Sequence, residues 1–264
     1  MNNSSSCLQI AHCLSTISSM LSITDLVTND AVHPDIQSLI DITRDPANND
    51  PFLISALSPF FPYTQSIYMQ NESALESHWA EKIIHSENPK KTLYDFPYID
   101  KYQQICDNEE NIIQIYAPEA KNILIVGSGP CPITALLYSE KYTITLLNRD
   151  ESALNTSKDL NKALQKTNMR YCLSDIKEAS NISDHDVILF GVSVGNAEQK
   201  KELLEEICKN MKPDSILLAR TSPGLRQLLY PSITESDIPY NAIYIGTHRS
   251  HPRTTSACIV LKKV

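Results

Sequence analysis

The chain has 264 residues, of which 31 are acidic and 23 basic, and its hydrophobic content of 42% is enough for one or two buried cores. It contains no apolar run near the roughly 20 residues of a membrane helix, and its polar first six residues do not resemble a secretory signal, so we expect neither membrane insertion nor secretion. The formal charge of −8 argues against nucleic acid as a partner and favours a neutral or cationic small molecule.

The seven cysteines are scattered along the chain, without a Cys-x-x-Cys pair or the histidine spacing of a zinc site. We therefore expect reduced, mostly structural thiols, a cytoplasmic location and no bound metal. The sequence leaves the oligomeric state open, a homodimer included.

The composition changes near residue 120. All six glycines lie beyond that point, and residues 1–120 carry 16 acidic and 5 basic residues, whereas residues 121–264 carry 15 and 18. Together with the change of hydrophobic period described below, this predicts a helical N-terminal domain over residues 1–118 and a second domain over residues 119–264. The acidic excess of the first half is either a solvated surface, which we favour, or a means of attracting a cation.

Apolar residues at helical spacing predict two helices near the N-terminus. The first apolar stripe consists of Leu8, Ala11, Leu14, Ile17, Ser18 and Leu21. The second consists of Val32, Ile36, Leu39 and Ile40, with Pro34 at the helix start.

The prolines of residues 46–62 favour short helices and turns. A helix is then predicted over residues 74–86, with Leu75, Trp79 and Ile83 on its apolar face. A further helix is expected to begin near Pro97, with Asp95 as its cap.

The second half changes to short apolar runs with amphipathic stretches between most of them, which is typical of a parallel, doubly wound α/β sheet covered by helices on both faces. The predicted strands are residues 122–126, 143–147, 169–173, 187–192, 215–219, 242–247 and 256–261. A polar loop with His248, Arg249, His251 and Arg253 joins the last two strands.

A glycine turn, residues 127–132 (GSGPCP), follows the first of these strands. Pro132 stands where a dinucleotide-binding fingerprint has its third glycine, so a pyrophosphate cradle is not expected. Gly127, Ser128 and Gly129 still allow a ligand to lie against the backbone. The alternative is a mere strand-to-helix turn.

Polar residues at the next two strand ends complete a predicted adenosine site. Asn148 and Asp150 lie about 20 residues beyond the glycine turn, where a ribose-binding residue is expected. Asp175 and Ile176 are placed to hold an adenine, although Asp175 is almost equally well explained as a helix N-cap. An adenosine site without a pyrophosphate cradle points to S-adenosylmethionine rather than a nicotinamide cofactor.

Four motifs in the same order resemble the nicotianamine synthase family. Residues 74–79 (ALESHW) are similar to its L-E-S-H-aromatic helix, and residues 96–102 (FPYIDKY) to its F-P-Y-x-D-x-Y segment. Residues 127–134 (GSGPCPIT) are similar to G-S-G-P-x-P-x-T, and residues 218–231 (LARTSPGLRQLLYP) to R-x-x-x-G-x-R-x-x-L-Y-P after a strand. Asn148, where many members carry an acid, and residues 191–195 (GVSVG) depart from the family pattern.

The resemblance implies a class I methyltransferase-like Rossmann domain preceded by a helical capping domain. It also implies transfer of the 3-amino-3-carboxypropyl group of S-adenosylmethionine to an amine, with release of methylthioadenosine, in the synthesis of a metal-chelating product. The acceptor would be a second S-adenosylmethionine or an amino acid such as histidine or glutamate. An ordinary methyltransferase of a small molecule and a sensor of adenosyl ligands without turnover are the alternatives.

The candidate catalytic residues are Glu76 and Tyr102. Glu76 shares a helix face with apolar residues, so its charge needs a partner. By itself it is better explained as an edge residue that reaches solvent, but the resemblance reverses this preference in favour of a catalytic or amine-binding carboxylate. Tyr98 and Tyr102 are four residues apart and are predicted to project together into a pocket, the alternative being core tyrosines. The resemblance places Tyr102 near the reacting amine.

Arg220 and Arg226 are the candidate substrate-binding residues, because arginine binds carboxylates with two parallel hydrogen bonds. An internal salt bridge that holds the last strand in place is an equally good explanation. His78 is either a partner of Glu76 or a surface histidine.

Overall fold

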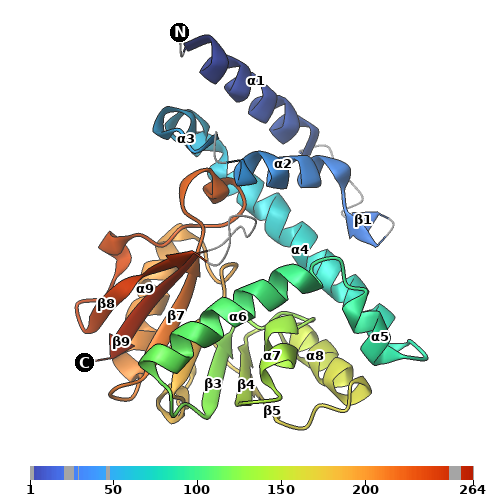
Figure 1. The fold of residues 1–264 in the computed structure, drawn as a ribbon, viewed down its shortest axis with the longest axis vertical. Coiled ribbons are helices and arrows are strands. Elements are labelled where there is room, and N and C mark those ends of the chain that lie inside the picture. The colour runs from blue at the N-terminus through green and yellow to red at the C-terminus, as the bar shows by residue number, and fades with distance from the viewer. Residues whose placement is uncertain (1–2, 21–26, 29, 46–47, 250–256, 264) are drawn as a thin grey trace.

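The computed structural model describes residues 3–20, 27–28, 30–45, 48–249 and 257–263. In Figure 1 the helices of the first half lie above and across a sheet formed by the second half. The helices of the first half are α1 (Asn3–Met20), α2 (Pro34–Arg44), α3 (Pro51–Leu57), α4 (Phe61–Ile84), α5 (Pro89–Tyr94) and α6 (Ile99–Tyr116). A small antiparallel pair, β1 (Val27–Thr28) and β2 (Ala31–Val32), lies between α1 and α2.

Of the apolar stripe predicted for α1, Ile17 is buried, but Ala11, Leu14 and Ser18 are exposed, so the buried face is shifted from the predicted one. Cys13, Thr16 and Ile17 are buried, whereas Leu14 is 36% exposed and Ala11 is exposed; the side chains of Leu8 and Leu21 lie outside the described residues. The helix packs against α2 and α3 at one end of the molecule (Figure 1), and its small polar residues on every side leave the choice of face to these contacts. The predicted second stripe is confirmed, because its four residues in α2 and just before it are all buried.

Helix α4 is longer than predicted. It begins at Phe61, with Pro62 in the first turn, where a missing backbone N–H leaves no hydrogen bond unmade. Its predicted apolar face of Leu75, Trp79 and Ile83 is buried, as expected.

The predicted cap of the next helix is wrong. Asp95 ends α5 instead, and α6 begins at Ile99 after Tyr98 as its N-cap residue, which makes no side-chain capping hydrogen bond. The aromatic turn between the two helices separates Asp95 from the start of α6.

The second half forms a seven-stranded sheet in the order β5-β4-β3-β6-β7-β9-β8. The predicted strands are confirmed within a few residues, although Ser256 lies outside the described residues. The elements are β3 (Asn122–Val126), α7 (Ile133–Tyr138), β4 (Thr143–Asn148), α8 (Glu151–Ala163), β5 (Met169–Leu173), β6 (Val187–Phe190), α9 (Ala197–Asn210), β7 (Ile216–Thr221), β8 (Ala242–Arg249) and β9 (Ala257–Lys263).

The sheet is mixed rather than fully parallel. The five strands from β5 to β7 pair in parallel, and β9 inserts antiparallel between β7 and β8. The short polar connection between β8 and β9 forces this direction, because parallel neighbours need a long crossover.

Helices cover both faces of the sheet, α6, α7 and α8 on one and α9 on the other (Figure 1). Ile123 and Ile125 of β3 pack with the first group, and Leu124 and Val126 with the second, so the strand is buried on both faces. The strand order reverses at β3, which has β4 on one side and β6 on the other. Ligands of such sheets bind outside the carboxyl ends of the strands at this switch point.

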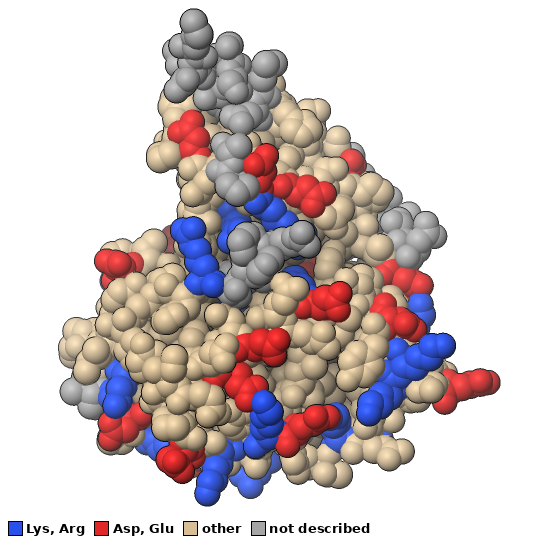
Figure 2. All heavy atoms as spheres, in the orientation of Figure 1, with Lys and Arg blue, Asp and Glu red and all other residues tan. Residues whose placement is uncertain are grey.

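Acidic and basic side chains are interspersed on the face of the sheet-bearing half in Figure 2. Within the described residues no helix is long and apolar enough to cross a membrane.

The six cysteines whose side chains are described are free thiols, and five of them are buried.

Candidate active site

A cavity of about 740 Å³ opens at the carboxyl edge of the sheet, beneath α4 and α6. This volume is within the range of pockets that hold a nucleoside-sized ligand. The loops after β3, β4, β5 and β6 form one part of its wall, and side chains of α4 and α6 form another. The cavity therefore lies where the two halves of the chain meet.

The glycine turn is held in a conformation that favours glycine. Gly127 and Gly129 have φ angles of 75° and 66°. A Cβ atom on Gly127 would lie 2.1 Å from Val194 Cγ2, and one on Gly129 would lie 2.4 Å from Glu76 Oε2. The turn thus exposes backbone to the cavity and brings it against the carboxylate of Glu76.

The predicted adenosine residues Asn148, Asp150, Asp175 and Ile176 all line the cavity. Asp150 and Asp175 are N-cap residues: Oδ1 of Asp150 accepts from the Ala153 backbone and Oδ1 of Asp175 from the Lys177 backbone. Asp175 is therefore an N-cap residue, as the alternative explanation expected, and it lines the cavity as well. A carboxylate has a second oxygen, so capping leaves each side chain one oxygen for a ligand.

The loop of residues 191–195 also lines the cavity, and its Val194 side chain lies against Gly127 of the glycine turn. Lys200, which is 1% exposed, donates a hydrogen bond of 2.8 Å from Nζ to the Val192 carbonyl and so fixes this loop. Burial lowers the pKa of Lys200 to about 7. The burial of this lysine is not expected from the sequence, because a charged residue on an amphipathic helix is usually solvated.

Glu76 and Tyr102, the two candidate catalytic residues, meet in the cavity wall. The Tyr102 hydroxyl donates to Glu76 Oε1 over 3.3 Å. Burial among protein atoms, followed by the negative charge of Glu72, raises the pKa of Glu76 well above its usual value. A carboxyl with a raised pKa is suited to take up a proton near neutral pH.

Three further polar residues line the same end of the cavity and were missed from the sequence: Glu72, Lys101 and Tyr230. The Tyr230 hydroxyl donates to Glu72 Oε1, and Lys101 Nζ lies 3.9 Å from the same oxygen. The available signal was the spacing of Glu72 and Glu76, four residues apart on one face of a helix.

Tyr98 and Arg226 do not line the cavity. Tyr98, the N-cap residue of α6, packs edge-on against Phe96, which Tyr102 also contacts, so the two tyrosines lie close together but only Tyr102 reaches the cavity. Arg226 lies in the 3-10 helix Gly224–Leu228, which packs against α2, α3 and α4, and the positive charges of Arg249 and Arg44 adjoin it there.

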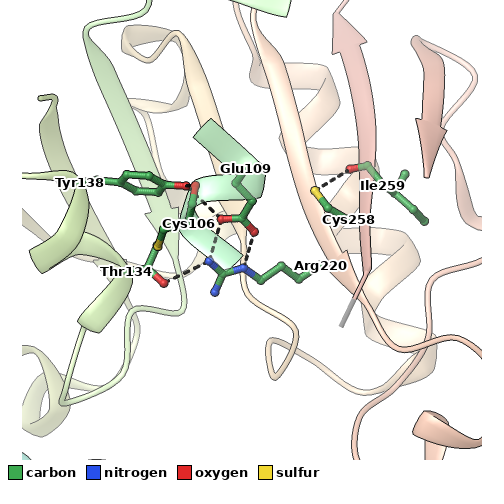
Figure 3. A network of polar contacts seen from close by, with 7 residues as sticks. All are labelled: Cys106, Glu109, Thr134, Tyr138, Arg220, Cys258 and Ile259. Atoms are coloured by element: carbon green, nitrogen blue, oxygen red, sulfur yellow. Dashed lines mark hydrogen bonds and ion pairs between the residues drawn. The ribbon is translucent and has the colours of Figure 1, made fainter. Parts of the chain in front are cut away.

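Arg220 lines the cavity and also forms the predicted internal salt bridge (Figure 3). Its Nε and Nη2 donate to the two carboxylate oxygens of Glu109 at 2.7 and 2.8 Å, and Nη2 also donates to Thr134 at 3.1 Å. Tyr138 donates to Glu109 as well. Burial opposes the charge of Arg220, but Glu109 outweighs this effect and raises the pKa of the guanidinium.

Replacing Glu109 with glutamine is expected to destabilise the fold by about 3–5 kcal/mol, because the 1% exposed carboxylate is the partner of a buried arginine. Urea unfolding of the variant measures this loss. Glu110→Gln is the matched control, since its neighbouring carboxylate pairs with an exposed lysine, Lys141. Similar losses in the two variants would contradict the assignment.

His78 is not a partner of Glu76. Its Nε2 lies 2.7 Å from Asp30 Oδ1, and Lys82 contacts the same aspartate. This leaves His78 on the outer face of α4. Among the described residues no three His, Cys, Asp or Glu side chains are placed to hold a metal ion.

The family model described as nicotianamine synthase protein matches residues 6–264. The chain belongs to the nicotianamine synthase family. Nicotianamine synthase of Solanum lycopersicum is 29% identical over 178 residues, covering 64% of this chain and 56% of that protein. Nicotianamine synthase 3 of Oryza sativa subsp. indica is 26% identical over 209 residues, covering 73% and 60%. This family member therefore spans little more than half the length of these plant relatives.

Solved structures with the same fold include a crystal structure of MtNAS in complex with MTA and tNA. Its TM-score is 0.82, at 18% identity and over 97% of both chains. A mutant of MtNAS in complex with S-adenosylmethionine gives a TM-score of 0.81 at 16% identity, over 96% of this chain and 97% of the other. With the sheet order above, this likeness confirms the predicted class I methyltransferase-like fold with N-terminal helices.

Proposed function

We propose that this nicotianamine synthase family member transfers the 3-amino-3-carboxypropyl group of S-adenosylmethionine to an amine and releases methylthioadenosine. The product would be a nicotianamine-like metal chelator. The observation that carries the proposal is the contact between the glycine turn and Glu76. It brings the backbone that would bind the nucleoside and a carboxylate that could accept a proton together in one cavity.

The donor would lie along the strand ends. Asp150 and Asn148 would bind the ribose, Asp175 and Ile176 the adenine, and Gly127, Ser128 and Gly129 would let the sulfur-bearing arm pass against the backbone. This places the cationic sulfonium near Glu76, where the carboxylate stabilises a positive charge.

The transfer is a displacement at carbon. The nitrogen lone pair forms the new N–C bond, the C–S bond breaks, and its electron pair stays on sulfur, which leaves as the neutral thioether of methylthioadenosine. The nitrogen gives up its proton to the Glu76 carboxylate, whose raised pKa favours this transfer. The cavity selects the longer arm over the methyl group by placing the amine in line with that carbon.

Arg220 would bind a substrate carboxylate. Its Nε and Nη2 are engaged by Glu109 and Thr134, and Figure 3 shows the third nitrogen, Nη1, pointing away from these partners. The Glu109 pair would then fix the direction of Nη1. The acceptor is a second S-adenosylmethionine or an amino acid, and the metal is bound by the released product. The same proposal places the enzyme in the cytoplasm, where thiols stay reduced.

The deciding experiment incubates the pure protein with S-adenosylmethionine, alone and with single amino acids, and identifies the nucleoside product by mass spectrometry. Methylthioadenosine is the expected product. S-adenosylhomocysteine instead would show a methyltransferase, and tight donor binding without any turnover would show a sensor.

Tyr102→Phe is expected to lower kcat about 10- to 100-fold, the effect of losing a hydrogen bond to a charged group. Affinity for methylthioadenosine, measured by calorimetry, should stay within about threefold, since the ring remains. Tyr94→Phe, at an exposed position of α5, is the control and should change neither quantity. A kcat unaffected by Tyr102→Phe would remove this residue from the mechanism.

A further inference from the structure

Helix α4 presents two carboxylates to the cavity rather than one. Glu72 and Glu76 both line it, and they are four residues apart. This spacing corresponds to one helical turn, a separation of about 6 Å along the helix axis. Only Glu76 has a part in the transfer described above.

The two carboxylates have parallel surroundings. Glu76 Oε1 accepts from Tyr102, and Glu72 Oε1 accepts from Tyr230, whose ring packs edge-on against Tyr68 at 5.0 Å. Each tyrosine occupies one carboxylate oxygen and fixes the group, which leaves capacity to bind a cation. The Glu72 carboxylate is therefore held by a tyrosine hydroxyl in the same way as the Glu76 carboxylate, and it too can bind a ligand.

Lys101 lies beside both pairs. Its Nζ is 3.9 Å from Glu72 Oε1 and lies over the rings of Tyr98 and Tyr102, at 5.1 and 5.3 Å from their centroids. Its side chain is 14% exposed, and among the described residues the ammonium group makes no direct hydrogen bond. A largely buried ammonium that lines a cavity without a hydrogen-bond acceptor is suited to a ligand carboxylate.

We propose that Glu72 and Lys101 form an acceptor subsite that selects an α-amino acid with a second positive charge three carbons from its nucleophilic amine. This inference rests on the proposed function. An extended N–C–C–C–N chain places its end atoms about 5 Å apart, close to the rise of about 6 Å between Glu72 and Glu76 along the helix axis. The reacting amine then lies at Glu76 and the second cation at Glu72, with the acceptor carboxylate at Lys101.

The subsite makes charges alternate along the bound acceptor, so each buried charge has an opposite neighbour. Three kinds of acceptor satisfy the spacing: a second S-adenosylmethionine, whose sulfonium is three carbons from its amine; histidine in its imidazolium form; and the adduct of a first transfer. Glutamate does not, because it would bring a negative charge to Glu72. The transfer step itself is unchanged, since Glu72 binds and takes no proton.

The spacing is tested with the wild-type protein, S-adenosylmethionine and a series of single acceptors, with methylthioadenosine release as the readout. The series is 2-aminobutyrate, 2,3-diaminopropionate, 2,4-diaminobutyrate and ornithine, in which the second amine is absent or lies two, three or four carbons away. We expect 2,4-diaminobutyrate to exceed 2-aminobutyrate in kcat/KM by about tenfold or more, as a charged hydrogen bond contributes. Equal values across the series would overturn the inference and leave the proposed function intact.

Glu72→Gln provides the second test. It should raise the acceptor KM, reduce the preference for 2,4-diaminobutyrate to about twofold or less and leave methylthioadenosine affinity unchanged. Glu81→Gln, on the exposed face of the same helix, is the matched control for folding and should keep the full preference.

If only S-adenosylmethionine serves as acceptor, Glu72→Gln must lower methylthioadenosine release from S-adenosylmethionine alone by about tenfold while Glu81→Gln does not. An unchanged rate would overturn the inference. Absence of methylthioadenosine under every condition would instead overturn the proposed function, and the inference with it.

Discussion

Glu76→Gln is expected to lower kcat by at least about a hundredfold, the usual effect of removing a general base. Affinity for methylthioadenosine should change by less than about threefold, because the amide keeps the shape of the side chain beside Gly129. Steady-state assays of methylthioadenosine release give kcat, and calorimetry gives the affinity for methylthioadenosine. The exposed Glu81→Gln should behave like the wild type.

The pH dependence of the wild type should reveal the same group. Burial and the charge of Glu72 raise the pKa of Glu76, and only its ionised form accepts a proton. The rate should therefore increase as the pH rises through this elevated pKa, well above the usual 4.5. The Glu76→Gln variant should not show this increase of rate with pH.

If Glu76→Gln lowers kcat and donor affinity by the same factor, the substitution has disrupted the pocket, and the result contradicts the role of Glu76 as a base.

Stability provides an independent check of the raised pKa. A carboxyl that binds its proton more tightly in the folded state than in the unfolded state stabilises the fold below the unfolded pKa, and that contribution is lost as the pH rises through the folded pKa. Glutamine does not titrate. Glu76→Gln should therefore match the wild type near pH 4 and gain free energy of unfolding relative to it as the pH increases.

The sheet and the cavity wall formed by the strand ends could be predicted from the sequence because their information is local. Each strand is a short apolar run, and the glycine turn and the strand-end residues follow such runs directly. Asn148, Asp150 and Asp175 then meet by topology alone, since parallel strands end at one edge.

The cavity wall formed by α4 and α6 could not be predicted in the same way, because it depends on how distant helices pack. Tyr230 reaches Glu72 across 158 residues, and Glu109 reaches Arg220 across 111. Neither contact can be predicted from the hydrophobic periodicity of the sequence, which reports only on neighbouring residues. Lys101 and Glu72 individually are ordinary charged residues of a helix, and only the approach of α6 to α4 places them in one cavity.

Replacing Gly129 of the glycine turn with alanine is also expected to have a large effect on the protein. Gly129→Ala places a Cβ atom 2.4 Å from Glu76 Oε2 on a backbone with a φ of 66°. The left-handed conformation costs a non-glycine residue about 1–2 kcal/mol, and the added Cβ must displace the Glu76 carboxylate, which the hydrogen bond from Tyr102 holds. We expect the cost to appear either as a fall of about thirtyfold in methylthioadenosine affinity, which corresponds to about 2 kcal/mol, or as a similar loss of folding free energy.

The cost must emerge in one of two measurements. If the turn keeps its shape, the fold loses stability and Glu76 is displaced; if the turn relaxes, stability is kept and the backbone no longer fits the donor. Calorimetry and urea unfolding of the same variant separate these cases, and Gly246→Ala, whose Cβ would lie 3.8 Å from His248, is the matched control. A Gly129→Ala protein with wild-type affinity and stability would show that the turn does not need glycine, and the backbone surface on which the donor site is built would then be wrong.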